Sequence, residues 1–187
     1  MSIIQINNLS FTYEGSFDPV FEQVSFQIDT DWKLGFIGRN GKGKTTFLKL
    51  LTGEYEYSGS ILSSVDFEYF PYQVENKEQL TYEIAGSVNP AMEHWELLRE
   101  LNLLDADAEI LYRPFCSLSF GEQSKVLLAK SLCEPAHLFV WDEPLNYIDI
   151  FSRIQLEDLL LACQPTMLFV EHDRTFREKI ATEIIEL

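Results

Sequence analysis

The stretch Gly38-Arg39-Asn40-Gly41-Lys42-Gly43-Lys44-Thr45-Thr46 decides the fold of this chain. It fits the pattern G-x-x-x-x-G-K-[ST], in which a glycine-rich loop joins a strand to a helix and cradles phosphate groups. Residues 33–37 before it read as a short buried strand, and residues 47–51 after it carry the apolar face of a helix. The sequence therefore predicts a site for a nucleoside triphosphate at this loop.

The polar groups of the loop have distinct expected roles. Its backbone N–H groups can close on phosphate oxygens, and the N-terminus of the following helix adds partial positive charge. We expect Lys44 to reach the terminal phosphates and the Thr45 hydroxyl to bind Mg²⁺. An ordinary glycine turn before a helix is the alternative interpretation. The predicted nucleotide-binding residues of the loop are Gly38, Asn40, Gly41, Lys42, Gly43, Lys44, Thr45 and Thr46.

Composition limits the kinds of protein that this chain can be. Its 187 residues, 46% of them hydrophobic, are enough for one well-cored domain, which we place at 1–187. The net charge of −16 argues against direct nucleic-acid binding by this chain alone. No apolar run approaches the roughly 18 residues of a membrane helix, and the three cysteines form no C-x-x-C pair. We therefore expect a cytoplasmic protein without disulfides or a zinc site.

The order of predicted elements indicates an α/β fold. Two edge strands are expected at 4–13 and 24–28, and two more strands at 60–62 and 67–70. An acidic helical insert follows at 74–117, with its clearest amphipathic helix at 92–104. Helices at 120–132 and 152–162 then alternate with buried strands at 138–141 and 167–170. This order predicts a P-loop NTPase core with a parallel sheet, an antiparallel β edge subdomain and a small helical insert.

Two carboxylates end the predicted strand at 138–141. Ligands of open α/β sheets bind outside the carboxyl ends of the strands, which would bring Asp142 and Glu143 close to Lys44. Asp142 suits the acidic role on the Mg²⁺ side of a phosphate-loop nucleotidase. Glu143 could accept a proton from the attacking water or hold that water in line. An acidic turn before Pro144 is the alternative.

The segment Leu118-Ser119-Phe120-Gly121-Glu122-Gln123 begins a helix, and Ser119 with Glu122 forms the capping-box pattern S-x-x-E. The simplest interpretation is a well-capped helix. The segment is also similar to the signature sequence of ATP-binding-cassette (ABC) ATPases, and it precedes the Asp-Glu strand as it does in that family. The resemblance implies that Ser119 and Gly121 hold the γ-phosphate of a nucleotide bound to the opposite subunit.

Four further elements then follow the order of that family across nearly the whole chain. Gln73 resembles the glutamine that senses Mg²⁺ and the attacking water, and 144–149 resembles the loop that crosses the subunit interface. His172 resembles the switch histidine at the γ-phosphate, and Tyr13 sits where the family stacks an aromatic ring on adenine, with Phe11 as a competitor. Taken without the family, the simpler interpretations are favoured: Gln73 as a surface turn residue, His172 as a cap after a buried strand and Tyr13 as an ordinary strand aromatic.

The chain most resembles the soluble ABC-F group, particularly its antibiotic-resistance branch, whose members act on the ribosome. The resemblance implies hydrolysis of ATP with Mg²⁺ in a sandwich of two domains, formed by a homodimer or with a second ABC domain. Only one such domain and no long helical linker are present in this sequence, so a shortened or fused form is expected. The alternatives are the cytosolic ATPase subunit of a transporter, docked on a membrane partner, and an inactive ATP-binding remnant.

Three positions depart from the family pattern. Phe120 replaces a glycine and would crowd the approach to Ser119. Leu145 and Tyr147 replace the Thr and His of the commoner interface loop, which would alter communication between sites. Glu171 replaces a serine beside the histidine and would add a carboxylate near a phosphate. None of these changes removes a chemically essential group, so hydrolysis stays the expectation.

Overall fold

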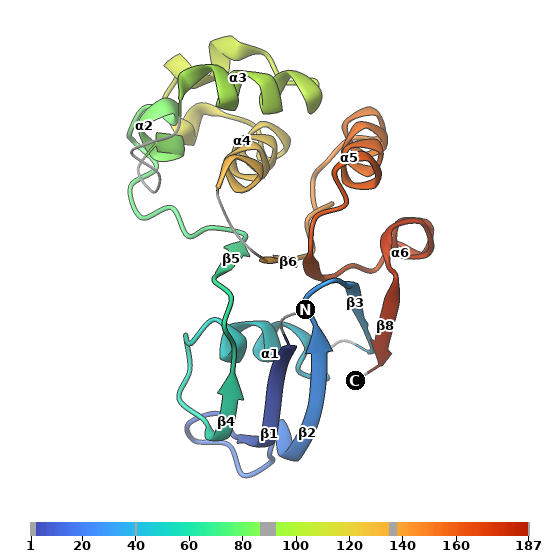
Figure 1. The fold of residues 1–187 in the computed structure, drawn as a ribbon. Helices are drawn as coiled ribbons and strands as arrows, with labels where there is room; N and C mark the ends of the chain where they lie inside the picture. Colours follow the sequence, from blue (N-terminus) through green and yellow to red (C-terminus); the bar gives the residue numbers. More distant parts are fainter. Residues whose placement is uncertain (1–2, 40, 87–92, 135–137, 187) are drawn as a thin grey trace. The chain divides into compact units, whose positions relative to one another are not determined.

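The computed structural model describes residues 3–39, 41–86, 93–134 and 138–186. The chain folds as two compact units, each built from separate stretches of sequence (Figure 1). The sheet unit comprises Met1–Phe67, His137–Asp142 and Pro165–Leu187. The helical unit comprises Glu68–Ala136 and Glu143–Gln164. The α/β fold class predicted from the sequence is confirmed.

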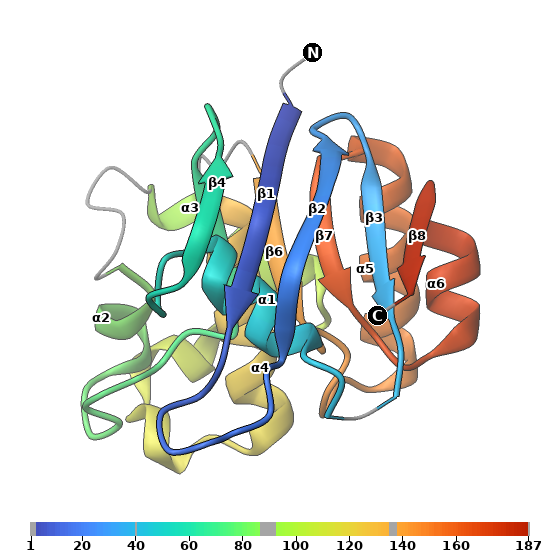
Figure 2. The same cartoon turned by 90° about the horizontal axis from the view of Figure 1, so that it is seen from below.

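A small antiparallel sheet forms the first part of the sheet unit. Its strands are β1 (Ile3–Phe11), β2 (Phe21–Asp29) and β4 (Ser58–Leu62), in the order β2-β1-β4 (Figure 2). The prediction that β1 is an edge strand is wrong, because it pairs on both sides. Alternating burial shows that one face of a strand is covered, but it does not show how many neighbours the strand has. The strand also ends at Phe11, two residues earlier than predicted.

The parallel strands of the sheet unit carry the loop and the first predicted carboxylate. They are β3 (Lys33–Ile37), β6 (Leu138–Asp142), β7 (Met167–Val170) and β8 (Glu183–Glu186), and neighbours follow the order β6-β7-β3-β8. The short apolar runs predicted at 138–141 and 167–170 are these buried strands. β8 was not predicted, because its four residues carry two exposed glutamates and lack an apolar run.

Helix α1 (Lys44–Leu51) packs on both sheets of this unit through Phe47. The Phe47 ring lies 5.0 Å from that of Phe36 in β3 and 5.4 Å from that of Phe26 in β2, between ring centroids. Phe21 adds an edge contact at 6.2 Å. These buried aromatic contacts fix α1, and therefore the loop before it, against two strands. The second helix of the unit, α6 (Arg174–Ile180), follows β7.

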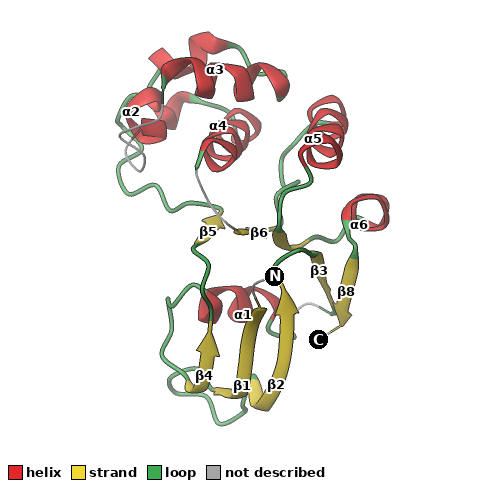
Figure 3. Cartoon of the chain, in the orientation of Figure 1, coloured by secondary structure: helices red, strands yellow, loops and turns green. Residues whose placement is uncertain are grey.

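The helical unit begins at Glu68, within strand β5 (Phe67–Phe70), and its other regular elements are helices (Figure 3). These are α2 (Thr81–Gly86), α3 (His94–Leu103), the 3₁₀ helices η1 (Ala108–Tyr112) and η2 (Phe115–Ser117), α4 (Phe120–Cys133) and α5 (Ile150–Cys163). The predicted insert at 74–117 contains the first four. Its clearest helix starts at His94, and Met92 lies outside the described residues.

Packing of α3 on α4 forms the core of the helical unit. Leu97 and Leu101 of α3 are fully buried, as are Val126 and Leu128 of α4. Leu97 and Leu101 are four residues apart and therefore share one face of α3. Val126 and Leu128 instead lie on different sides of α4, within a run from Val126 to Ser131 that is buried all round. Of the helices within the described ranges, none is long and apolar enough to span a bilayer.

The three cysteines all lie in the helical unit. Cys116 and Cys163 are exposed to solvent. Cys133 is partly covered, and burial raises the pKa of its thiol to about 12. All three are free thiols in this structure.

Candidate nucleotide site

The phosphate loop connects β3 to α1, as its pattern predicted. Gly41 and Gly43 have φ of 80° and 91°, in the left-handed region that glycine adopts without strain. At Gly43, a Cβ would lie 2.6 Å from Val20 Cγ1, so only glycine fits there. A side chain at either glycine would therefore disfavour this backbone conformation of the loop. Asn40 lies outside the described residues.

Lys44 points back into the curl of the loop. Its side chain is 7% exposed, and Nζ donates hydrogen bonds to the carbonyl oxygens of Gly38 at 2.9 Å and Arg39 at 3.2 Å. The next residue, Thr45, is exposed, whereas Thr46 is buried. The Lys44 ammonium is thus held against the loop, where its positive charge suits a phosphate group.

An aromatic cluster lies beside the start of α1. The Tyr13 hydroxyl is 2.6 Å from Thr46 Oγ1, which ties this ring to the helix that follows the loop. The Tyr13 ring stands edge-on to the rings of Phe11 and Tyr55, at 4.9 Å and 5.8 Å. Tyr13 is 42% exposed and Phe11 is 8% exposed. Of the two competing aromatics, Tyr13 is therefore the one with accessible ring surface.

The register of the parallel strands brings three chain segments to one edge of the sheet. Phe36 of β3 pairs with Val170 of β7, and Val170 pairs with Asp142 of β6. The phosphate loop leaves β3 just beyond this row, and His172 follows β7 by two residues. Asp142 is buried at the carboxyl end of β6, whereas His172 is exposed. Loop, carboxylate and imidazole thus share the edge at which parallel sheets bind ligands.

Glu171 turns its carboxylate toward the backbone. Its Oε1 accepts hydrogen bonds from the N–H groups of His172 at 2.7 Å and Asp173 at 3.1 Å, and the side chain is buried. Asp173 in turn caps α6 by accepting from the N–H of Phe176 at 2.9 Å. The Glu171 carboxylate, which stands where the family pattern has a serine, therefore stabilises the turn that contains His172.

The oxygen donors at this edge fit a magnesium nucleotide. The Thr45 hydroxyl and the Asp142 carboxylate are hard oxygen ligands, which Mg²⁺ prefers. Within the described ranges, no three or more His, Cys, Asp or Glu side chains cluster into a metal site of their own. Mg²⁺ usually binds through one or two protein groups together with substrate phosphates, and Thr45 and Asp142 would supply two such groups.

The predicted capping box at the start of α4 is present. The Ser119 side chain accepts from the N–H of Glu122 at 3.2 Å, and the N–H of Ser119 donates to Glu122 Oε2 at 2.7 Å. The hydrogen bonds with Ser119, helped by the nearby charge of Arg113, hold the pKa of the Glu122 carboxyl below its usual value, although partial burial opposes this shift. Ser119 is exposed, so its hydroxyl can still meet a ligand.

The two unusual aromatics of the helical unit contact each other. The rings of Phe120 and Tyr147 are stacked with 5.4 Å between centroids and an interplanar angle of 29°. They are 69% and 71% exposed. The backbones of the two segments also lie close together, because a Cβ at Gly121 would lie 3.0 Å from the carbonyl oxygen of Tyr147. Phe120 therefore lies against the loop 143–149.

Glu143 opens that loop. It has a φ of 53° and is partly exposed. Its Oε2 accepts a hydrogen bond of 2.7 Å from the side-chain amide of Asn146. Sequence reasoning named the segment that contains Asn146 but did not name this residue as part of the site. Its role depends on a turn geometry that no sequence pattern specifies.

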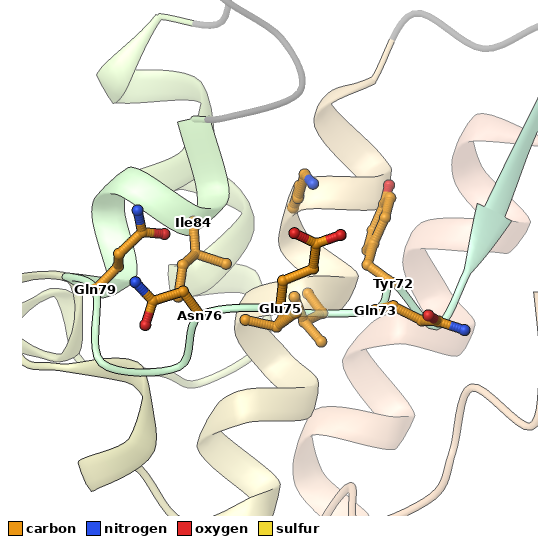
Figure 4. Close-up of a pocket in the computed structure, with 9 residues that line it drawn as sticks. Tyr72, Gln73, Glu75, Asn76, Gln79 and Ile84 are labelled. Carbon is orange, nitrogen blue, oxygen red and sulfur yellow. The ribbon is translucent and has the colours of Figure 1, made fainter.

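Gln73 lines a cavity of about 370 Å³ within the helical unit (Figure 4). Tyr72 and Lys130 lie at the same cavity, with the Lys130 ammonium 3.9 Å from the centre of the Tyr72 ring. Lys130 is only 2% exposed, and this burial lowers the pKa of its ammonium group. Burial also raises the pKa of the Tyr72 hydroxyl, which donates to the Glu68 carboxylate. Gln73 itself is exposed to solvent.

A protein-family model matches about two thirds of this chain. The model of the family described as ABC transporter matches residues 21–146, which include the phosphate loop, the signature segment and Asp142. The chain belongs to the ABC transporter family. Within it, the chain is a nucleotide-binding domain, and the curated relatives that it resembles include members of the ABC-F group.

Two curated relatives and one solved structure describe the likeness of this ABC domain. ABC transporter F family member 5 of Arabidopsis thaliana is 30% identical over all of this chain and 28% of its own length. Ribosome protection protein VmlR of Bacillus subtilis (strain 168) is 32% identical over 86% of this chain and 30% of its own length. An ATP-bound bacterial Atm1-family ABC exporter has the same fold, with a TM-score of 0.85 at 16% identity over all of this chain and 37% of the exporter chain. This chain spans less than a third of the length of these two curated relatives.

Proposed function

We propose that this ABC domain binds ATP with Mg²⁺ and hydrolyses it, as an ATPase of the ABC-F type. The observation that carries the proposal is the shared sheet edge, where the curled loop with Lys44, the Asp142 carboxylate and His172 come together. Family membership supports it, because the family model matches a stretch that includes this loop, the signature segment and Asp142. We further propose that the protein acts in the cytoplasm.

Each predicted side chain takes a defined role in this proposal. Lys44 and the loop N–H groups bind the β- and γ-phosphates, and the exposed face of Tyr13 stacks on adenine. Thr45, Asp142 and Gln73 would hold Mg²⁺, which when bound neutralises charge on the phosphates. His172 contacts the γ-phosphate. Glu143 accepts the proton of the attacking water.

We propose that the active site is completed by a second ABC domain, either another copy of this chain or a different chain. Ser119 and Gly121 at the start of α4 would contact the γ-phosphate held by that partner. The capped helix start is suited to this role, because its N–H groups and partial positive charge favour an anion. Loss of such pre-placed donors costs on the order of 10²–10³ in rate, so one chain alone should hydrolyse ATP poorly.

The concentration dependence of ATPase activity tests the paired site. The rate should rise with the square of protein concentration, and a linear rise would contradict pairing. Glu143→Gln should abolish turnover and trap an ATP-bound dimer, which size-exclusion chromatography with ATP detects. Unchanged turnover in this variant would remove Glu143 from the base role. No turnover by the unmodified chain at high concentration would favour an inactive remnant.

We propose the ribosome as the target of the domain, with antibiotic resistance as the outcome of that action. The support is likeness to a relative named a ribosome protection protein. Sedimentation of cell extracts that contain the Glu143→Gln variant and ATP tests whether the target is the ribosome. Enrichment in the ribosome pellet supports the proposal. Enrichment with membranes supports the alternative, an ATPase subunit of a transporter.

A further inference from the structure

The loop 143–149 contains two residues in a backbone conformation that ordinary side chains rarely adopt. Glu143 has a φ of 53° and Tyr147 a φ of 67°. Both values lie in the left-handed region, where a residue other than glycine is strained. Such strain persists only where neighbouring groups hold the backbone in place. The contacts that hold the backbone of this loop in place therefore indicate the function of its conformation.

Hydrogen bonds inside the loop close it around the Glu143 carboxylate. The backbone N–H of Asn146 donates to the Glu143 carbonyl at 3.2 Å, and that of Ile148 donates to the Leu145 carbonyl at 3.1 Å. The Asn146 side chain then reaches back to Glu143 Oε2 at 2.7 Å. One residue thus fixes both the backbone and the carboxylate of Glu143.

Three contacts tie the same loop to α4. The Tyr147 ring stacks on Phe120, the first residue of the helix. The Tyr147 carbonyl lies so close to Gly121 that a Cβ there would be only 3.0 Å away. At the end of the loop, the Asp149 carboxylate accepts a charged hydrogen bond from Lys125 Nζ at 2.7 Å. The loop and the first two turns of α4 are therefore held together.

We propose that Asn146 and Tyr147 are positioning residues for Glu143. Asn146 sets the orientation of the carboxylate, and Tyr147 holds the strained turn by stacking on Phe120. The inference rests on the proposed function in one respect, which is that Glu143 acts on the attacking water. Two of the departures from the family pattern, Phe120 and Tyr147, are on this account a single coupled feature.

Steady-state kinetics test the role of Asn146. Asn146→Ala should lower kcat at least tenfold while the Kd for ATP changes less than twofold, because the residue orients the carboxylate and contacts no predicted nucleotide ligand. A kcat for Asn146→Ala within twofold of the unmodified chain would overturn this part.

The Tyr147 contact is tested with matched aromatic variants. Tyr147→Ala and Phe120→Ala should each lower kcat by about the same factor, and the double variant should be no slower than either, because one stack is lost in all three. Tyr147→Phe keeps the ring and should retain kcat within twofold. Tyr112→Ala, which removes an exposed aromatic elsewhere in the helical unit, serves as the control and should be unchanged. Additive losses from Tyr147→Ala and Phe120→Ala would overturn the coupling.

Hydrogen exchange tests the turn without any ATPase activity. In Tyr147→Ala the amides of Asn146 and Ile148 should exchange at least tenfold faster, because both donate the hydrogen bonds that close the turn. The same amides should be unchanged in Tyr112→Ala. Unchanged exchange in Tyr147→Ala would overturn the inference even if Glu143→Gln is inactive. Unchanged turnover in Glu143→Gln would instead contradict the proposed base.

Discussion

At the scale of single residues, loss of the hydrogen bond between Tyr13 and Thr46 should weaken ATP binding by a measurable amount. Tyr13→Phe keeps the ring but leaves the buried Thr46 hydroxyl without this partner, so ATP binding should weaken by a factor of about 2–10, the range that one net hydrogen bond supports. Tyr13→Ala removes the ring as well and should weaken binding more. Titration with a fluorescent ATP analogue measures both, with Tyr55→Phe as the control. Equal affinity of the Phe and Ala variants would contradict stacking by this ring.

A pair of glycine variants separates backbone strain from crowding in the phosphate loop. Gly41→Ala introduces only the strain of a φ of 80°, because nothing lies within 4 Å of the new Cβ. Gly43→Ala adds a contact of 2.6 Å with Val20 Cγ1. Gly41→Ala should cost about 1–2 kcal/mol of folding free energy, and Gly43→Ala more than that. Chemical denaturation measures both, and equal losses would mean that the loop shifts to accommodate the methyl group.

Residues of the candidate site could be predicted from sequence where a short pattern fixes the chemistry. The phosphate loop and the capping box of Ser119 and Glu122 are such cases, since each pattern implies one local geometry. Asn146 and Tyr55 were not predicted, because their contacts depend on a turn and on an aromatic cluster formed by distant segments. The roles assigned to Glu143, His172, Gln73 and Tyr13 stay predictions.

At the scale of elements, the start of α5 should make stability depend on pH. The hydrogen bond from the Lys125 ammonium, followed by that from the Ser152 N–H, holds the pKa of the Asp149 carboxyl well below its usual value of about 3.9. A depressed carboxyl pKa contributes stability above the unfolded pKa and loses it as pH falls toward the folded one. This contribution should therefore be complete at neutral pH and decline below about pH 4.

Asp149→Asn tests this dependence, because asparagine still caps the helix but carries no charge. At pH 7 the variant should be less stable by about 1 kcal/mol or less, since the Asp149 side chain is 47% exposed and the pair is screened by solvent. The difference from the unmodified chain should shrink as pH falls from 4 toward 2. Urea denaturation at several pH values measures it, and a difference independent of pH would exclude the charge as the cause.

Elements with a strong local signal were predicted well, and those defined by their neighbours were not. Helix α4 begins at its capping box, and β7 follows its apolar run of four residues. β8 and the central place of β1 escaped prediction, because both depend on pairing with strands distant in sequence. The strand order of a sheet is set by tertiary packing, which local periodicity does not encode.

At the scale of the whole molecule, the net charge of −16 should oppose self-association. If the proposed partner is a second copy, the Glu143→Gln dimer formed with ATP should weaken on going from about 0.1 M to 0.01 M salt, because the screening length grows from roughly 10 Å to 30 Å. Light scattering at both salt concentrations measures the dimer fraction. The opposite trend would indicate that attractive charge pairs dominate the contact.

The prediction of a single domain over 1–187 stays open to experiment. The sheet unit is built from three separated stretches of the chain, and the helical unit is built from two. Neither unit is a continuous segment, so neither can be removed by a simple truncation. One cooperative unfolding transition, seen alike by tyrosine fluorescence and circular dichroism, would support the prediction.

The placement of the cysteines makes the native chain convenient for spectroscopy. Cys116 and Cys163 are accessible, whereas the covered Cys133, with its pKa of about 12, carries almost no reactive thiolate at neutral pH. A maleimide dye should therefore attach at two positions, both outside the body that holds the phosphate loop. Replacing either one leaves a single fluorophore whose polarisation would report motion of the helical unit, with the phosphate loop chemically unmodified.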